Sequence, residues 1–365
     1  MQNNIKIGNT FLNKKVLITG HTGFKGTWLS TWLKLLGADI TGISIDIPTS
    51  PSHYAKTTLS SEINDLRFDI RSKELNRCIN KIKPDFIFHL AAQSLVTKSH
   101  EDPLDTWSTN VIGTANLLNS LIDYKRKCVS IFITSDKCYD NREWEWGYRE
   151  TDLLGGSDPY SGSKASAEIL INSFVKSFFG KSHPVKVASV RAGNVIGGGD
   201  WSSNRIIPDV IRAWASNKAV KIRNPNATRP WQHVLEPLSG YLTLAAYMYK
   251  KNKLQGESFN FGPNDNQIKT VRNVVKSIYN YLPKKSLIIK KGSNTNNEHH
   301  FLKLNCDKAL NTLNWTSTLN FEETIKLTME WYLAYYNNPR KIYQETISQI
   351  KYYEKIAKQR KLVWS

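Results

Sequence analysis

The feature that most restricts the fold of this chain is a glycine-rich turn, GHTGFKG at residues 20–26, set between a short apolar run and a helical pattern. The run Val16–Thr19 is typical of a buried strand, and apolar residues recur at helical spacing over 28–36 until Gly37 ends the pattern. A strand, a tight glycine turn and a helix in this order bring free backbone amides to the start of the helix, where they can hold a phosphate. This arrangement indicates a unit suited to binding a dinucleotide.

Strands and helices keep alternating as far as about residue 195. Apolar strands are expected at Ile40–Ile45, Phe86–Leu90, Val129–Thr134 and Val187–Val190, and helices at Leu75–Ile82, about Asp105–Tyr124 and about Tyr160–Phe179. Strands that alternate with helices pair in parallel through right-handed crossovers, and continuous apolar strands indicate a sheet covered on both faces. The sequence therefore predicts an α/β fold with a doubly wound, Rossmann-type parallel sheet.

Beyond residue 195 the pattern is mixed, with short strands between helices expected near 208–216, 236–250, 270–282 and 321–337. Asn320 and Glu323 have the spacing of an N-terminal capping box. We predict three parts: a Rossmann domain over residues 1–195 with some later segments returning to it, a smaller mixed α/β lobe over 196–340 that binds the substrate, and a basic helical tail over 341–365.

Charge and cysteine usage narrow the possible partners. The 365 residues include 50 Lys and Arg against 31 Asp and Glu, a formal charge of +19. Because the basic residues are scattered, they indicate solvated positions and a field that favours an anionic small molecule, and we expect no nucleic-acid or membrane partner. The four cysteines form no CxxC pair and no zinc-type spacing, so no metal site is predicted. With no signal-peptide core and no run near the ~18 apolar residues of a membrane span, a cytoplasmic location is expected.

The residues around the glycine turn favour NAD as the cofactor. The glycines, spaced GxxGxxG, allow the backbone to approach a pyrophosphate closely. Asp46 closes the second strand, where its carboxylate can accept hydrogen bonds from the adenosine ribose and would repel a 2′-phosphate. Asp69 and Ile70 follow a third expected strand and are placed to meet the adenine.

Two groups of residues carry candidate chemistry. Tyr160 and Lys164 lie four residues apart at the start of a helix, so both side chains share one face. A nearby ammonium group and an oxidised nicotinamide would favour the phenolate, which could take a proton from a sugar hydroxyl. Ser135 closes the preceding strand and is placed to hydrogen-bond the same hydroxyl. Asp136 and Lys137 add an acid–base pair that simple dehydrogenation does not require, or else they form a surface ion pair.

These motifs together resemble the extended short-chain dehydrogenase/reductase family, and within it the sugar-nucleotide 4,6-dehydratases. The resemblance runs from about Lys15 to at least Asp307. It rests on TGHTGFKGTWL from Thr19, HLAAQSLV from His89, TSDKCYDN from Thr134, DPYSGSK from Asp158, RAGNVIGGGDW from Arg191 and TRPWQHVLEPL from Thr228. The last two are more specific than the general motifs of the fold.

The resemblance implies the site residues and a reaction. The catalytic set is Ser135, Asp136, Lys137, Tyr160 and Lys164. Cofactor contacts fall on Gly20, Thr22, Gly23, Phe24, Lys25, Gly26, Asp46, Asp69, Ile70, Ala91, Ala92, Tyr160 and Lys164, and substrate contacts on Gln93, Ser94, Asn194, Arg205 and Arg229. Trp201 and Trp231 are candidates either to contact the nucleotide or to pack in the core.

In such enzymes, NAD oxidises C4 of a nucleotide-linked hexose, the 4-ketone acidifies the C5 proton, water leaves across C5 and C6, and hydride returns to C6. The family also implies a homodimer and a place in deoxysugar biosynthesis, as for the O-antigen of lipopolysaccharide. One detail points to CDP-glucose as the substrate: the dTDP-glucose branch carries Asp-Glu where this chain has Asp136-Lys137, and the CDP-glucose branch resembles Asp-Lys. Lys137 would act either as a neutral base for the C5 proton or as a charged stabiliser of the enolate.

Three other functions stay open at this point. A 4-epimerase of nucleotide sugars would share the fold, the cofactor and the Tyr160–Lys164 pair, although it has no use for Asp136 and Lys137. A dehydratase of another nucleotide-linked hexose would share the whole catalytic set. A non-catalytic Rossmann scaffold that binds RNA through its basic surface is the most distant alternative.

Overall fold

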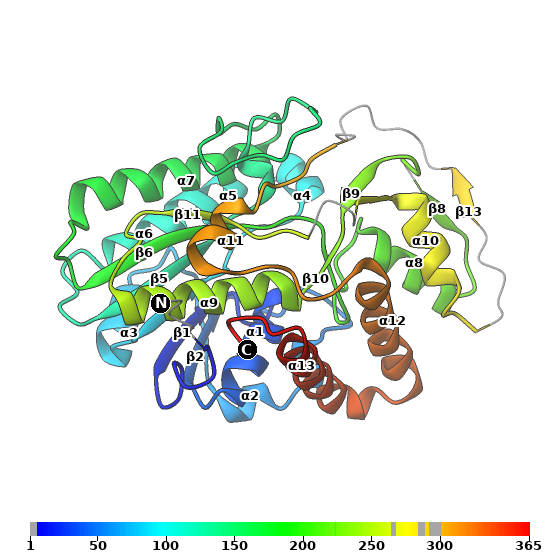
Figure 1. Ribbon diagram of the computed structural model, residues 1–365, viewed down its shortest axis with the longest axis horizontal. Helices are drawn as coiled ribbons and strands as arrows, with labels where there is room; N and C mark the ends of the chain where they lie inside the picture. The colour runs from blue at the N-terminus through cyan, green and yellow to red at the C-terminus, as the bar shows by residue number, and fades with distance from the viewer. Residues whose placement is uncertain (1–5, 223, 264–267, 284–288, 292–300) are drawn as a thin grey trace.

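The computed structural model describes residues 6–222, 224–263, 268–283, 289–291 and 301–365. Its centre is a seven-stranded sheet in the order β11-β6-β5-β4-β1-β2-β3, in which every neighbouring pair is parallel (Figure 1). The strands are β1 (Lys15–Thr19), β2 (Asp39–Ser44), β3 (Asn64–Arg67), β4 (Phe86–His89), β5 (Cys128–Ile133), β6 (Val185–Arg191) and β11 (Ser258–Asn260). The predicted doubly wound parallel sheet is confirmed.

Helices cover both faces of this sheet, as the apolar strands predicted. One face carries α1 (Phe24–Leu35) and α9 (Leu235–Lys251), and the other carries α3 (Glu74–Ile82), α6 (Gly113–Asn119) and α7 (Pro159–Phe178). Side chains of one strand alternate between two buried clusters, because successive residues of a strand point to opposite faces. In β1, for example, Val16 and Ile18 join the cluster under α1 and α9, while Leu17 joins the cluster under α6 and α7.

The helix expected over 105–124 is interrupted and ends earlier than predicted. It consists of α5 (Pro103–Trp107), a π-helical turn η2 (Ser108–Ile112) and α6, which ends at Asn119. The π turn holds Asn110, whose buried side-chain amide donates to the Gln93 carbonyl at 3.0 Å and to Ser163 Oγ at 2.9 Å. Such turns widen a helix locally and occur often at functional sites.

The later part of the chain builds a second group of elements at one end of the molecule and also returns to the sheet (Figure 1). The group at the end comprises α8 (Ile206–Ala215), α10 (Val271–Tyr279), β8 (Val220–Ile222) paired with β13 (Ile289–Lys291), and β9 (Thr228–Pro230) paired with β12 (Ile268–Thr270). The returning elements are β11, α9 and α13 (Ile342–Gln359), which packs on α1. Residues 341–365 are thus anchored, with the Trp364 ring 6.0 Å from that of Trp32.

The remaining elements are short connections, apart from the long helix α12. Asn320 and Glu323 form the predicted capping box at the start of α12. The elements are β7 (Val195–Ile196) paired with β10 (Gln232–His233), α12 (Phe321–Asn337), α2 (Leu59–Glu62), α4 (Val96–Glu101), α11 (Asp307–Leu313), and the turns η1 (Tyr54–Lys56), η3 (Asp136–Cys138) and η5 (Pro339–Lys341). None of the helices in the described ranges has the length and apolar character of a membrane-spanning segment.

Candidate active site

The strand order places a crevice at the carboxyl ends of β1 and β4. The chain runs from β1 through β2 to β3 on one side and from β4 onward on the other, so the connections diverge at this point. Ligands of doubly wound sheets bind at such a switch point. A cleft of about 1690 Å³ opens there and extends to the lobe formed by α8 and β9.

All the residues that the sequence proposed for the site line this one cleft. They are Gly20, Thr22, Gly23, Phe24, Lys25, Gly26, Asp46, Asp69, Ile70, Ala91, Ala92, Gln93, Ser94, Ser135, Asp136, Lys137, Tyr160, Lys164, Asn194, Arg205 and Arg229, together with Trp201 and Trp231. The fold thus brings together residues that are spread over more than half of the chain.

The turn between β1 and α1 has room for glycine alone at two positions. Gly20 has a φ of +75°, and a Cβ there would lie 2.7 Å from the Ala91 nitrogen. A Cβ at Gly26 would lie 2.1 Å from the Gly20 carbonyl oxygen. Because these side chains are missing, the backbone of β1, β4 and α1 can pack closely and present amides at the start of α1. The turn therefore fits the pyrophosphate of a dinucleotide.

Arg67, a basic residue that the linear sequence did not indicate, lies beside Asp46. Asp46 is exposed, and its backbone carbonyl accepts hydrogen bonds from Thr22 Oγ1 at 2.7 Å and from Arg67 at 3.2 Å. Arg67 comes from the end of β3 and also pairs with Asp65 at 2.7 Å. Asp69 is bound by the guanidinium group of Arg71, whose hydrogen bonds lower the Asp69 pKa.

The catalytic candidates meet in a buried group at the end of β5. Ser135 Oγ donates to Asp136 Oδ1 at 3.0 Å and accepts from the backbone amide of Lys137 at 3.2 Å. The exposed fractions of Tyr160, Ser135 and Asp136 are 8%, 6% and 5%. A Cβ at Gly193 would lie 1.7 Å from Asp136 Oδ2, so the glycine of the RAGNVIGGGDW motif makes room for this carboxyl group.

Burial sets the direction in which the pKa values of Tyr160 and Lys164 move. Burial raises the pKa of Tyr160 to about 12, although the nearby Ser135 hydroxyl acts in the opposite direction. Burial also lowers the pKa of Lys164 to about 8, because a buried ammonium group loses its hydration. Its Nζ donates to the Ile133 carbonyl at 3.4 Å. Burial thus disfavours the charged form of both side chains.

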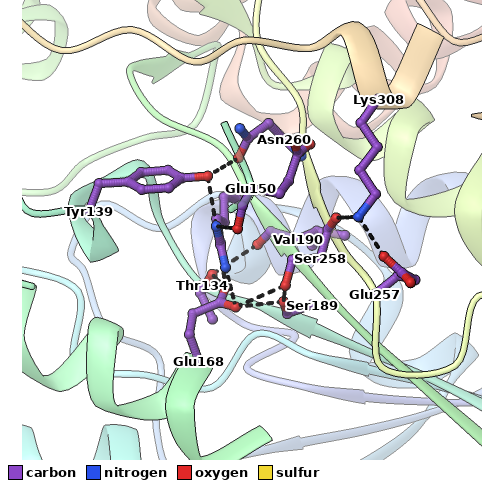
Figure 2. A network of polar contacts seen from close by, with 11 residues as sticks. Thr134, Tyr139, Glu150, Glu168, Ser189, Val190, Glu257, Ser258, Asn260 and Lys308 are labelled. Carbon is purple, nitrogen blue, oxygen red and sulfur yellow. Dashed lines mark hydrogen bonds and ion pairs between the residues drawn. The ribbon is translucent and has the colours of Figure 1, made fainter. Parts of the chain in front are cut away.

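A buried ion pair supports the helix that carries Tyr160 and Lys164. Glu168, one turn beyond Lys164, accepts hydrogen bonds from Arg191 Nε at 3.0 Å and from the Thr134 and Ser189 hydroxyls (Figure 2). Arg191 also donates to the Tyr139 hydroxyl at 2.7 Å. Burial would raise the pKa of Glu168, but Arg191 and these hydrogen bonds bring it below its usual value. The pair ties α7 to β5 and β6.

Breaking this pair should cost much of the stability of the fold. We expect Glu168→Ala to lower the free energy of unfolding by about 3–5 kcal/mol, because Arg191 would stay buried without a counter-charge. The double variant Glu168→Met/Arg191→Met should lose less, since it removes both charges. Equilibrium unfolding in urea measures both values. Equal losses in the two variants would contradict the ion-pair explanation.

The substrate candidates differ in how much of their side chain is already engaged. Arg205 pairs with the buried Asp200 at 3.0 Å at the start of α8. The Gln93 side-chain amide is already engaged, since it donates to Thr106 Oγ1 in α5 and accepts from the Leu95 backbone amide. Asn194 has a left-handed φ of 51°, which sets the turn between β6 and β7.

Both tryptophans pack in the core while they line the cleft. The centroid of the Trp201 ring lies 5.0 Å from that of Tyr335, with the rings tilted by 55°, and Trp231 Nε1 donates to the Lys269 carbonyl at 3.0 Å. Lys25 extends toward the catalytic group, and burial together with the field of Arg205 lowers its pKa to about 8.

Sequence reasoning missed Asn110, which links the Gln93 backbone to Ser163 on the Tyr160 helix. The one available signal was a poor helix former in the middle of a helical pattern. The described residues contain no group of three or more side chains suited to holding a metal ion.

Comparison with known proteins identifies the family. A family model described as GDP-mannose 4,6 dehydratase matches residues 17–328. The chain is 46% identical to a CDP-glucose 4,6-dehydratase from Salmonella typhimurium over 90% of this chain and 92% of that protein. It is 25% identical to a UDP-glucose 4-epimerase from Mycoplasma pneumoniae, over 88% and 98% of the two chains.

Solved structures share the fold. An epimerase from Methanothermobacter thermautotrophicus is similar with a TM-score of 0.80 and 21% identity, over 93% of this chain and 98% of that one. The dTDP-glucose 4,6-dehydratase from Bacillus anthracis, in complex with NAD, is similar with a TM-score of 0.74 and 23% identity, over 89% and 97%. With its glycine turn, its Tyr-Lys helix and a family match over most of its length, the chain belongs to the GDP-mannose 4,6 dehydratase family of extended short-chain dehydrogenases/reductases.

Proposed function

We propose that the protein is an NAD-dependent hydro-lyase that converts CDP-glucose to CDP-4-keto-6-deoxyglucose. Bound NAD would take hydride from C4 of the hexose and return it to C6. Tyr160 would accept the proton of the C4 hydroxyl, and Asp136 would protonate the C6 hydroxyl so that it leaves as water. The substrate assignment follows the 46% identity with a CDP-glucose 4,6-dehydratase.

The placement of Asp136 is the observation that favours a dehydratase over an epimerase. This carboxyl group is buried, held by Ser135 and packed against Gly193, within the group that includes Tyr160. An epimerase only moves hydride away from and back to C4, so it has no use for an acid at C6. A strand-end ion pair would instead leave Asp136 near the surface.

Lys137 is suited to act at C5. Its side chain is half-buried and forms no hydrogen bond or ion pair with any residue in the described ranges, so its ammonium group is available to a ligand. It would remove the C5 proton when neutral or stabilise the enolate when charged, and the two roles differ in their pH dependence. Arg205, Arg229 and Asn194 would hold the diphosphate, for which guanidinium groups are well shaped.

The deciding experiment compares CDP-, dTDP-, UDP- and GDP-glucose side by side without added NAD. We expect a 4-keto sugar, detected by its absorbance in alkali, from CDP-glucose far faster than from the others. Formation of a 4-epimer with no 4-keto product would contradict the proposal. Faster turnover of another nucleotide sugar would leave the dehydratase activity supported, but it would contradict the assignment of cytosine as the nucleobase of the substrate.

Replacing Asp46 should reduce the preference of the protein for NAD over NADP. We expect apoprotein to regain little activity with NADP, because the Asp46 carboxylate repels a 2′-phosphate, and Asp46→Ala to reduce the ratio of the two Kd values. Arg67, which already touches the Asp46 backbone, would then be the nearest cation for that phosphate. Titration of apoprotein with each cofactor measures both Kd values, and Asp46→Ala/Arg67→Ala should not gain affinity for NADP. Equal affinities in the unaltered protein would contradict the assignment of Asp46.

A homodimer is proposed through the outer face of α5, η2 and α7. Leu104 is 80% exposed, and Ile112 and Ile169 are each 58% exposed on these neighbouring helices. Exposed apolar side chains gathered on adjacent helices are typical of interfaces. We expect light scattering to give the mass of a dimer and Ile112→Lys/Ile169→Lys to give a monomer. Leu153→Lys, which changes an exposed leucine elsewhere, is the control and should stay dimeric. A monomeric unaltered protein would contradict this face as an interface.

The proposal also covers the cellular location of the protein and the parts of the chain that bind each ligand. Cys78, Cys128, Cys138 and Cys306 are all free thiols, which fits a reducing cytoplasm. The elements after residue 195 would hold the nucleotide sugar, and the sheet with its flanking helices would hold the cofactor.

A further inference from the structure

We propose that Asp209 reads the 4-position of the substrate's base and selects cytosine over uracil and thymine. The inference rests on the proposed function and names the residue that would make a CDP-linked hexose, rather than a UDP- or dTDP-linked one, the substrate. Asp209 would accept a hydrogen bond from the 4-amino group of cytosine. The same carboxylate would repel the O4 atom that uracil and thymine carry in that place.

The cleft leaves one end for the base of the substrate. The glycine turn and Asp46 would hold the cofactor, and Tyr160 and Asp136 would meet the hexose. Beyond Arg205 the cleft continues along α8, and we call this part the lobe end. It is lined by Ile206, Asp209, Ile222, Asn224 and Val271. A nucleotide sugar with its hexose at the catalytic group and its diphosphate at Arg205 therefore places its base at the lobe end, against mostly apolar walls.

The helix α8 presents one of its faces to the cleft. Val210 and Ile211 are buried in the core, whereas Ile206 and Asp209, three residues apart on one face, are partly exposed and line the cleft. The Asp209 amide donates to the Arg205 carbonyl at 3.0 Å, so Asp209 lies one turn further along the helix. Four residues correspond to about 6 Å along the axis. A ligand whose phosphates meet Arg205 can therefore reach Asp209 with its base.

The Asp209 carboxylate is held at one oxygen and open at the other. Arg212 donates to Asp209 Oδ1 at 2.5 Å. The Arg212 guanidinium is itself fixed, because it also donates to the Trp201 carbonyl at 2.8 Å and to the Ser202 carbonyl at 3.1 Å. Asp209 Oδ2 forms no hydrogen bond with any residue in the described ranges. The carboxylate thus has a set orientation and one oxygen available to a ligand.

The neighbouring polar groups do not separate the two bases. Asp200 has both carboxylate oxygens engaged, since they accept hydrogen bonds from the Ser202 amide and from Arg205, each at 3.0 Å. Asn224 has a neutral amide, which carries both donors and an acceptor and so suits cytosine and uracil alike. Among the described residues that line the lobe end, Asp209 is therefore the one whose charge distinguishes an amino group from a carbonyl oxygen.

Calorimetric titration of the NAD-loaded protein with CDP and with UDP tests the inference without catalysis. We expect the unaltered protein to bind CDP about 10- to 100-fold more tightly than UDP, the range typical of one hydrogen bond to a charged group. Asp209→Asn should weaken the binding of CDP and strengthen that of UDP, because an amide can turn its NH2 group toward O4. Asp209→Ala, which removes the polar group altogether, should also bring the two affinities together.

The kinetic counterpart is a change in KM rather than in kcat. Because the base takes no part in the reaction of the hexose, Asp209→Asn should raise the KM for CDP-glucose by about 10- to 100-fold and change kcat little. Glu322→Gln is the matched control, since it removes one negative charge from an exposed position of α12 outside the cleft. It should keep the affinity ratio and the KM of the unaltered protein. Far-ultraviolet circular dichroism and the affinity for NAD should be equal in all these variants.

The outcomes distinguish the role of Asp209 from the function on which it depends. If the ratio of CDP to UDP affinity is the same in Asp209→Asn, Asp209→Ala and the unaltered protein, the inference is wrong, and the dehydratase assignment stands as long as CDP-glucose yields a 4-keto-6-deoxy sugar. Equal affinities of the unaltered protein for CDP and UDP also overturn the inference. If the variants lose a preference that the unaltered protein has, yet no nucleotide sugar gives a 4-keto product, Asp209 reads the base and the proposed reaction is wrong.

Discussion

Tyr160→Phe should lose C4 oxidation almost completely, with a fall in rate of about 100- to 10,000-fold. The phenol is the group proposed to accept the proton of the C4 hydroxyl, and it lies in the same buried group as Ser135 and Asp136. Phenylalanine keeps the ring and removes only this hydroxyl. Mixing the NAD-loaded variant with CDP-glucose should therefore give no absorbance of reduced cofactor, whereas the unaltered protein should give a transient.

The control for this variant is its stability. Loss of one hydrogen bond changes the free energy of unfolding by about 0.5–1.5 kcal/mol, so the variant should stay folded and bind NAD. Retention of the transient at its normal rate would falsify the assignment of Tyr160 as the proton acceptor.

Asp136→Asn should block the release of 4-keto-6-deoxy sugar, with a loss of about 100- to 10,000-fold in elimination. Asparagine keeps the size and polarity of the buried side chain but has no acidic proton for the C6 hydroxyl. Oxidation at C4 does not need this acid, so the reduced cofactor should form and then persist because the next step is blocked. Rapid quenching with mass analysis of the sugar would show the 4-keto hexose with its C6 oxygen still present.

The outcome that contradicts this assignment is normal product release by Asp136→Asn. The buried carboxyl group would then be a structural partner of Ser135, and another acid would have to reach C6. Lys137→Ala provides a comparison, since it should also stop elimination while leaving the Ser135–Asp136 hydrogen bond in place. Exchange of the C5 proton with deuterated solvent should slow in this variant if Lys137 is the base, and stay unchanged if Lys137 only stabilises the enolate.

The amino-acid sequence by itself determined the local elements and the identity of the chemistry. Apolar strands that alternate with helices, the glycine turn after β1 and the capping box at Asn320 each depend on residues close together in the chain, so periodicity and turn chemistry were enough to predict them. The Tyr160–Lys164 spacing likewise requires nothing beyond one helix. The periodicity of apolar residues did not predict the π turn around Asn110. This turn is held by hydrogen bonds from Asn110 to Gln93 and Ser163, which lie in other elements.

Only the tertiary structure decided which distant residues share one environment and what that environment does to their protons. Arg67 reaches the Asp46 backbone from another strand, and Glu168 finds its counter-charge in Arg191. The raised pKa of Tyr160 and the lowered pKa of Lys164 both come from burial, which no spacing along the chain records. Desolvation depends on every element that covers a side chain, so the proton chemistry of this site followed from the packing of the whole sheet and its lobe.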